Sequence, residues 1–151
     1  MIDIPRSQWV RALTAHPETM VIELANCLMK GWEIKHEALP ENGLSLLQMQ
    51  DGVFEESYYL GEIPLSTAWV KLSANGESWQ GAASVMNDTP DLAVALAICD
   101  AILANQLLGW EQVLQAVQQG IIKKQKEEAL RGAILAKTRI NLSLLTPEVD
   151  D

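Results

Sequence analysis

The sequence has few of the residues and motifs that bind nucleic acids or nucleotides. Only 11 of its 151 residues are Lys or Arg, against 20 Asp or Glu, and the formal net charge is −9. Duplex binding draws much of its free energy from Lys and Arg on phosphates, so this balance argues against a nucleic acid partner. Neither GxGxxG nor GxxxxGK occurs. No loop that would cradle phosphates with backbone amides is therefore visible.

Histidine and cysteine are also scarce. His16 and His36 are isolated and lack HxxE or HxxxH spacing, and His36 alternates with apolar residues, which favours a place on a sheet face over metal ligation. Cys27 and Cys99 lie outside any CxxC pattern and within apolar helical patterns. Two buried free thiols in a reducing compartment are favoured over a disulfide. We expect neither a metal nor a cofactor.

Long hydrophobic runs are missing as well. The longest, from Leu92 to Cys99, is far below the ~20 residues that span a bilayer, and no charged-then-apolar signal segment opens the chain. We therefore expect a cytoplasmic protein without a membrane partner. A length of 151 residues with 48% hydrophobic and 21% charged residues is typical of one globular domain.

What is present predicts an α+β fold. We expect an antiparallel sheet of about four to five strands, flanked by N-terminal helices and a C-terminal helical region. The expected strands are 32–38, 44–50, 58–60, 67–73 and 78–85, divided by turn residues that include Pro40 to Gly43, Asp51-Gly52, Gly61, Pro64 and Asn75-Gly76. Asn75-Gly76 is a strong hairpin signal, because both residues tolerate positive φ.

Helical patterns occupy both ends of the chain. They cover 6–15, 17–30, 89 to about 108, and 111–119. Thr89, Pro90 and Asp91 provide an N-cap, a first-turn proline and an acid at the positive helix end. The helix that follows is apolar almost all round, so it must be buried on more than one side. The sheet covers one side, and another helix or another subunit must cover the rest.

Charge divides the chain at about residue 122. Residues 123–139 hold six of the eleven basic residues and only two acids. We expect a core domain over 1–122 and, over 123–151, a basic helical segment with an acidic tail. Two interpretations of this segment stay open: the solvated face of a helix within the same domain, or an arm that docks on a partner.

Two residues stand out as candidates for an interface. Asp100 is a carboxylate inside an apolar helix, and a buried acid needs a partner. Hydrogen bonds from the backbone or from Arg or Lys, or a subunit contact, are favoured over a role as a base. Trp69 alternates away from Ala68 and Val70, so we expect it on the sheet face opposite the core, covered by another chain or by the C-terminal segment. A single exposed aromatic side chain is the simpler alternative.

Several segments together resemble the PhnG family, the small subunit of the bacterial carbon–phosphorus lyase core complex. The family usually has a polar or charged residue where Trp69 stands. The resemblance lies in the order and spacing of the following segments: Arg6–Leu13, Gly43-Leu44, Tyr59-Leu60-Gly61-Glu62, Thr67-Ala68 with Val70 and Leu72, Trp79-Gln80-Gly81, Ala97–Ala101 and Thr138-Arg139-Ile140-Asn141.

The resemblance implies an accessory, non-catalytic subunit of a transferase in phosphonate catabolism. It implies direct binding to a PhnI-like subunit, with PhnH-like and PhnJ-like subunits in a two-fold complex. That complex would displace the purine base of a nucleoside triphosphate by a phosphonate, giving ribose 1-phosphonate 5-triphosphate. We assign no catalytic residue to this chain, and the match to the family's tail makes Arg139 a third interface candidate.

Two other functions remain possible from the residues alone. One is a non-enzymatic small-molecule-binding or scaffold domain that dimerises through the helix from Leu92 to Leu108. The other is an independent hydrolase, which requires Asp100 and His36 to face one cleft.

Overall fold

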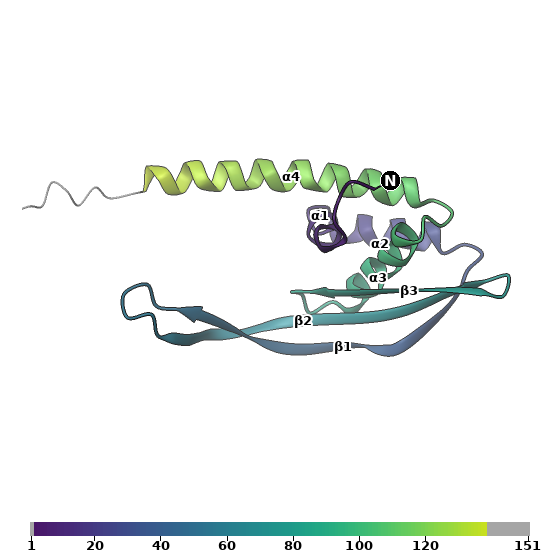
Figure 1. Cartoon of the computed structure of the whole chain (residues 1–151), viewed down its shortest axis with the longest axis horizontal. Coiled ribbons are helices and arrows are strands. Elements are labelled where there is room, and N and C mark those ends of the chain that lie inside the picture. The colour runs from purple at the N-terminus through teal and green to yellow at the C-terminus, as the bar shows by residue number, and fades with distance from the viewer. Residues whose placement is uncertain (1, 139–151) are drawn as a thin grey trace, which may run out of the picture.

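The computed structural model describes residues 2–138 and confirms the α+β class (Figure 1). Its elements are η1 (Arg6–Gln8), α1 (Trp9–Leu13), α2 (Glu18–Leu28), β1 (Glu33–Gln50), β2 (Ser57–Ala74), β3 (Glu77–Val85), α3 (Pro90–Ala104) and α4 (Trp110–Lys137).

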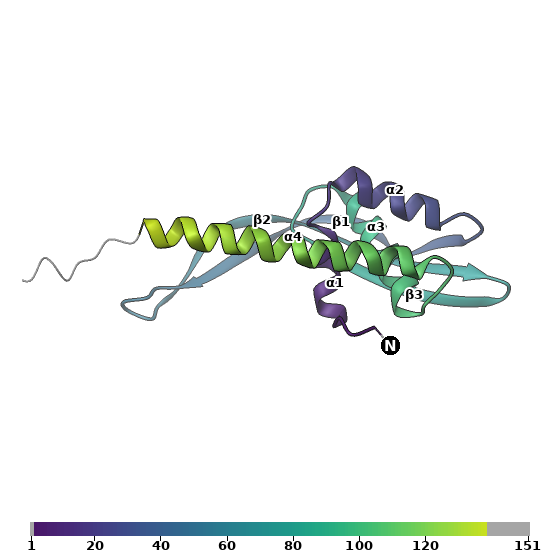
Figure 2. The same cartoon turned by 90° about the horizontal axis from the view of Figure 1, so that it is seen from above.

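Within residues 2–138, the helices cover one face of the sheet and leave the other face bare. The strands form an antiparallel sheet in the order β1-β2-β3. Helix α3 lies on β2 and β3, α2 packs beside α3, and α4 runs above them against α1 (Figure 1). Seen from above, α4 extends along the length of the sheet (Figure 2). The core consequently lies between the sheet and α4.

The described residues form three strands, so the expectation of four to five was wrong. β1 and β2 each run for 18 residues through positions whose residues predict turns. Pro40 lies on an edge strand within the register shift between Ala38 and Glu41, where its missing N–H costs no ladder hydrogen bond. Pro64 lies where β2 pairs only with β1, because β3 ends opposite Ser66. Gly61 adjoins a further register shift.

The hairpin and the start of α3 are confirmed. Asn75 and Gly76 have φ angles of 52° and 84°, and they connect Ala74 to Glu77 in a two-residue turn. Thr89 precedes α3, Pro90 occupies its first turn, and Asp91 lies beside the positive helix end. The local sequence therefore predicts these two features correctly.

Helix α3 is the centre of the core. Eleven of its 15 residues are buried, including Leu96, Ile98 and Ile102. The helix ends at Ala104 rather than near Leu108. Its close approach to the sheet depends on Gly81 of β3, where an added Cβ would clash with the α3 backbone. Helices α2 and α4 pack on sides of α3 that the sheet leaves open.

Helix α4 continues through Gly120, although the sequence pattern predicts a helix that ends at residue 119. Gly120 is buried, and an added Cβ there would lie 3.1 Å from Ala12 Cα and still closer to the Ala12 carbonyl group. The glycine is therefore the place where α1 and α4 approach each other, and it does not end the helix. Only the first part of α4 is buried, through Val113, Ala116 and Val117.

Two parts of the chain extend beyond this core in the same direction (Figure 1). One is the two-stranded part of the sheet that lies past the end of β3, residues 43–65, which we call the ribbon. The other is the second part of α4, residues 121–138, which we call the helix arm. Most side chains of both segments are exposed.

Candidate partner-binding surfaces

The bare face of the sheet carries Trp69, as the alternation in β2 predicts. Ser66, Ala68, Val70 and Leu72 are buried beneath the helices, and Trp69 points the other way with 47% of its surface exposed. None of the described residues covers its ring, because the described part of α4 lies on the helix side of the sheet (Figure 1). The position of Trp69 on the face is thus settled, and its role at an interface stays a prediction.

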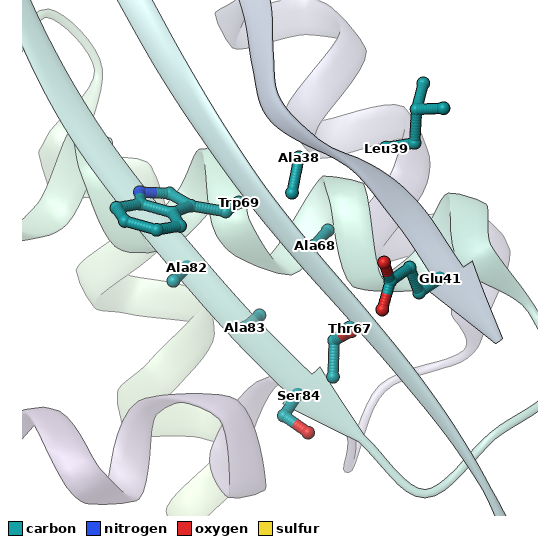
Figure 3. A pocket seen from close by; sticks show the side chains of 9 residues that line it. All are labelled: Ala38, Leu39, Glu41, Thr67, Ala68, Trp69, Ala82, Ala83 and Ser84. Carbon is teal, nitrogen blue, oxygen red and sulfur yellow. The ribbon is translucent and has the colours of Figure 1, made fainter. Parts of the chain in front are cut away.

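Trp69 forms one wall of an open, mostly apolar hollow of about 420 Å³ on this face (Figure 3). Its floor is formed by β2 and β3 at Thr67, Ala68, Ala82 and Ala83, of which Ala68 and Ala83 direct their buried side chains to the helix side. The indole stands above the alanines as a large apolar group with unfilled space next to it (Figure 3). The remaining lining residues are Ala38, Leu39, Glu41 and Ser84.

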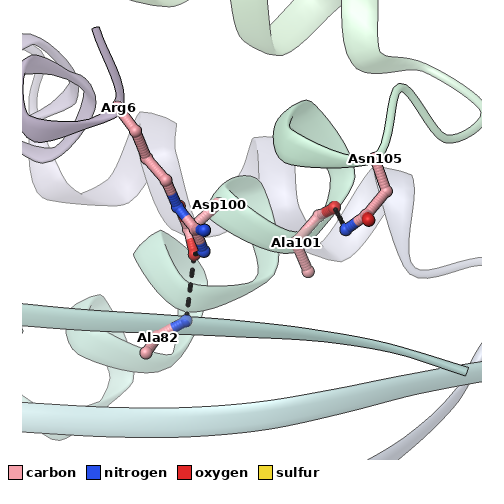
Figure 4. A network of polar contacts seen from close by, with 5 residues as sticks. All are labelled: Arg6, Ala82, Asp100, Ala101 and Asn105. Carbon is pink, nitrogen blue, oxygen red and sulfur yellow. Dashed lines mark hydrogen bonds and ion pairs between the residues drawn. The ribbon is translucent and has the colours of Figure 1, made fainter.

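Asp100 lies on the opposite side of the same strands and has its partners within the chain (Figure 4). Arg6 donates to its two carboxylate oxygens from Nε at 2.7 Å and from a terminal nitrogen at 2.5 Å. The backbone N–H of Ala82 donates to Oδ2 at 3.0 Å. The side chain of Asp100 is 7% exposed and that of Arg6 is 59% exposed. The bond to Asp100 raises the pKa of the Arg6 guanidinium, which stays charged.

These contacts connect the Trp69 surface to the core. Ala82 pairs with Trp69 across the strands, and its amide hydrogen is held by Asp100 on α3. Arg6 holds the same carboxylate from the segment that precedes α1. The position of Ala82 in the hollow is therefore fixed by three elements that lie far apart in the sequence. Arg6 was not predicted as the partner, because 94 residues separate it from Asp100.

The geometry does not assemble Asp100 and His36 into a catalytic pair. His36 lies exposed on β1 opposite Val70, and Asp100 is bound at β3, on the other side of β2. His36 and Asp100 do not line a common hollow. Since Arg6 and the Ala82 amide already occupy the carboxylate, Asp100 acts as a structural residue that orders η1 and β3.

The two cysteines differ from each other, and the expectation that both are buried was wrong for one of them. Both are free thiols. Cys99 is fully buried in α3, and burial together with the nearby charge of Asp100 raises the pKa of its thiol to about 12. Cys27 is exposed, because it lies on the side of α2 away from Val21, Ala25 and Leu28.

Residues 2–138 lack two further features that would point to a particular kind of site. Within this range no group of three His, Cys, Asp or Glu residues is placed to hold a metal ion. In the same range no helix combines the length and the apolar character needed to cross a membrane. Arg139, the third interface candidate, lies outside the described residues.

Comparison with known proteins gives one finding that covers nearly the whole chain. Residues 4–146 match the model of the family described as "Phosphonate metabolism protein PhnG". A search of curated proteins returned no match. The matched range includes both the ribbon and the helix arm, as well as the strands around Trp69 and the Arg6–Asp100 pair. The chain therefore belongs to the PhnG family of phosphonate metabolism proteins.

Proposed function

We propose that this protein is an accessory, non-catalytic subunit of a cytoplasmic carbon–phosphorus lyase core complex. Its role is to bind a PhnI-like subunit and keep it in a competent shape, with PhnH-like and PhnJ-like subunits in the same two-fold complex. The complex displaces the purine base of a nucleoside triphosphate by a phosphonate, giving ribose 1-phosphonate 5-triphosphate. The observation that carries the proposal is the family match over residues 4–146.

The bare sheet face supports binding of a protein partner. Trp69 exposes 47% of its surface beside an apolar hollow of about 420 Å³. Tryptophan is enriched among the residues that dominate interface energies, and burying an aromatic side chain contributes roughly 25 cal/mol per Å². The hollow is open along the sheet face, whereas small-molecule pockets enclose most of their ligand. This shape favours a protein surface over a small ligand.

Co-purification with the PhnI-like subunit tests this assignment. Trp69→Lys places a charge on the bare face without touching the core, so we expect the chain to fold and the partner to be lost. Leu108→Lys is the matched control, because Leu108 is an apolar side chain that is 82% exposed before α4. If Trp69→Lys retains as much partner as Leu108→Lys does, the bare face is not the binding surface.

Arg139 belongs to the same proposal as an anchor of the C-terminal segment. An Arg guanidinium forms two parallel hydrogen bonds with a carboxylate, which Lys cannot reproduce. We expect Arg139→Lys to weaken co-purification almost as much as Arg139→Ala. Full assembly with Lys would show that charge alone is sufficient.

Activity of the reconstituted complex tests the function itself. The PhnI-like, PhnH-like and PhnJ-like subunits should release purine from a nucleoside triphosphate and a phosphonate only when this chain is added. Equal purine release without this chain would show that it has no role in the reaction, even if it binds the other subunits.

A further inference from the structure

The ribbon exposes apolar side chains and carries charge of one sign. Residues 43–65 contain Asp51, Glu55, Glu56 and Glu62, and neither Lys nor Arg. The apolar side chains exposed in this segment by more than 40% of their surface are Leu44, Leu46, Met49, Val53, Phe54, Tyr58, Tyr59 and Leu60. A cluster of this kind on an elongated segment is typical of a surface that another chain covers.

Part of this apolar surface lies on the helix side of the ribbon. Leu44 pairs with Pro64 and Leu46 pairs with Glu62, in register with the pair of Asn42 and Ser66. Ser66 is buried beneath the helices, and alternate residues of a strand share a face. Leu44 and Leu46 therefore continue the core face of the sheet beyond the last helix that covers it, and they are 67% and 57% exposed.

The helix arm has the opposite charge. Residues 121–138 contain Lys123, Lys124, Lys126, Arg131 and Lys137, against Glu127 and Glu128. Within the same 18 positions Ile122, Leu130, Ile134 and Leu135 expose 52–64% of their surfaces. The arm is thus a basic helix with apolar side chains that the core does not cover.

The fold keeps these two oppositely charged segments apart. They extend in the same direction from the core and are separated along their length (Figure 1). At the point where they diverge, a hollow of about 660 Å³ is lined by Leu65 of the ribbon and by Lys124 and Arg131 of the helix arm. Arg11 of α1 forms an ion pair with Glu128 there. Each segment has the charge that would complement the other, and one copy of the chain does not bring them together.

We propose that a second copy of this chain fills the space, with the helix arm of each copy against the ribbon of the other. A two-fold axis makes both contacts equivalent, because the same pair of surfaces meets twice. The basic helix of one copy then lies on the acidic ribbon of its partner, and the apolar side chains on the facing sides of the two segments, Leu44 and Leu46 among them, are buried. This surface is distinct from the bare face that carries Trp69, so the inference stands independently of the function proposed above.

The dimensions of the two segments agree with this arrangement. Eighteen helical residues are about 27 Å long at 1.5 Å per residue, and eight strand residues are about 26 Å long at 3.3 Å per residue. Two strips of this length, each about 10 Å wide like a helix, bury surface on both copies and give on the order of 1,000–1,200 Å² in total. Stable specific interfaces begin at about this size.

Charge reversal on the isolated full chain tests the dimer. Glu56→Lys with Glu62→Lys makes the ribbon basic, and Lys126→Glu with Arg131→Glu makes the helix arm acidic. We expect light scattering and sedimentation equilibrium to show a dimer for the natural chain. Each reversed variant alone should dimerise at least about tenfold more weakly, because like charges then meet at both contacts.

Mixing the two reversed variants gives the most specific result. A basic ribbon then meets an acidic helix arm, and the natural helix arm of the first variant meets the natural ribbon of the second. We expect a heterodimer that forms more tightly than either variant with itself. Loss of folding in either variant would not be repaired by mixing, so recovery identifies the two segments as an intermolecular contact.

Glu23→Lys with Glu77→Lys is the matched control, since it reverses two exposed acids away from both segments. This control should dimerise like the natural chain at matched ionic strength. The inference is overturned if the natural chain is a monomer at ~100 μM in ~50 mM salt. It is equally overturned if the reversed variants dimerise like the control, or if mixing them yields no heterodimer.

Discussion

Strand β2 and helix α4 each have one part inside the molecule and one part outside it. In β2, residues from Ser66 to Leu72 alternate between buried and at least partly exposed, whereas residues 57–62 are all exposed. In α4, Val113 and Val117 are buried, whereas residues 125–138 are all exposed. The backbone geometry continues unchanged through both boundaries. Regular secondary structure and a hydrophobic core are therefore separate properties here, and substitutions on the two sides of each boundary should differ sharply in effect.

The largest difference should come from leucines in the sheet. Leu72 is fully buried and Leu46 is 57% exposed. We expect Leu72→Ala to lower the free energy of unfolding by about 2–5 kcal/mol, because it leaves a cavity beneath α3. Leu46→Ala should change it by less than about 0.5 kcal/mol in the isolated monomer. Urea denaturation of both variants at low protein concentration measures the difference, and equal losses would show that the ribbon shares the core.

Glycines of α4 provide a second pair, twelve positions apart on one helix. Gly120→Ala introduces a Cβ against the Ala12 backbone, so we expect a loss of about 1–3 kcal/mol as α1 and α4 separate. Gly132 has open space around it, and alanine favours helix over glycine by up to about 1 kcal/mol. Gly132→Ala should therefore keep or raise the helix content measured by circular dichroism. A stable Gly120→Ala variant would contradict the close approach of α1 and α4.

The smallest expected effect is on the reactivity of the two cysteines. Cys27 is exposed on α2, and Cys99 is buried in α3. At pH 8, a thiol reagent in excess should modify Cys27 quickly and Cys99 only after unfolding. Cys99 is buried and the pKa of its thiol is raised to about 12, so the folded chain holds this proton more tightly than the unfolded chain does. Stability should accordingly fall as pH rises from about 9 towards 12. Rapid modification of two thiols in the native protein would contradict the burial of Cys99.

The sequence was most informative where local chemistry decides the structure. Asn75-Gly76 and Thr89-Pro90-Asp91 fix a turn and a helix start within a few residues, and both predictions were confirmed. Alternation also placed Trp69 correctly, because one face of β2 is buried over that stretch. The family resemblance, which depends on the order of many short segments, was confirmed over residues 4–146.

Prediction failed where tertiary contacts override local preference. Pro40 and Gly43 have the chemistry of a turn, and they lie within β1 because an edge strand with register shifts tolerates them. Gly120 has the chemistry of a helix end, and it serves as a contact with α1. The partner of Asp100 was foreseen by type, and Arg6 could not be identified because no local pattern links residues 94 positions apart.

The bond between Asp100 and the Ala82 amide has a consequence for how this chain can polymerise. β3 is the last strand of the sheet, and its outward amide groups are a template on which a further strand could grow. At Ala82 that template is capped by a carboxylate, which Arg6 in turn holds in place. A strand that added at this edge would find the Ala82 amide already bonded. In a protein with so many exposed apolar side chains, this one bond works against pairing of the β3 edge with another copy and leaves side-chain contacts with partners unaffected.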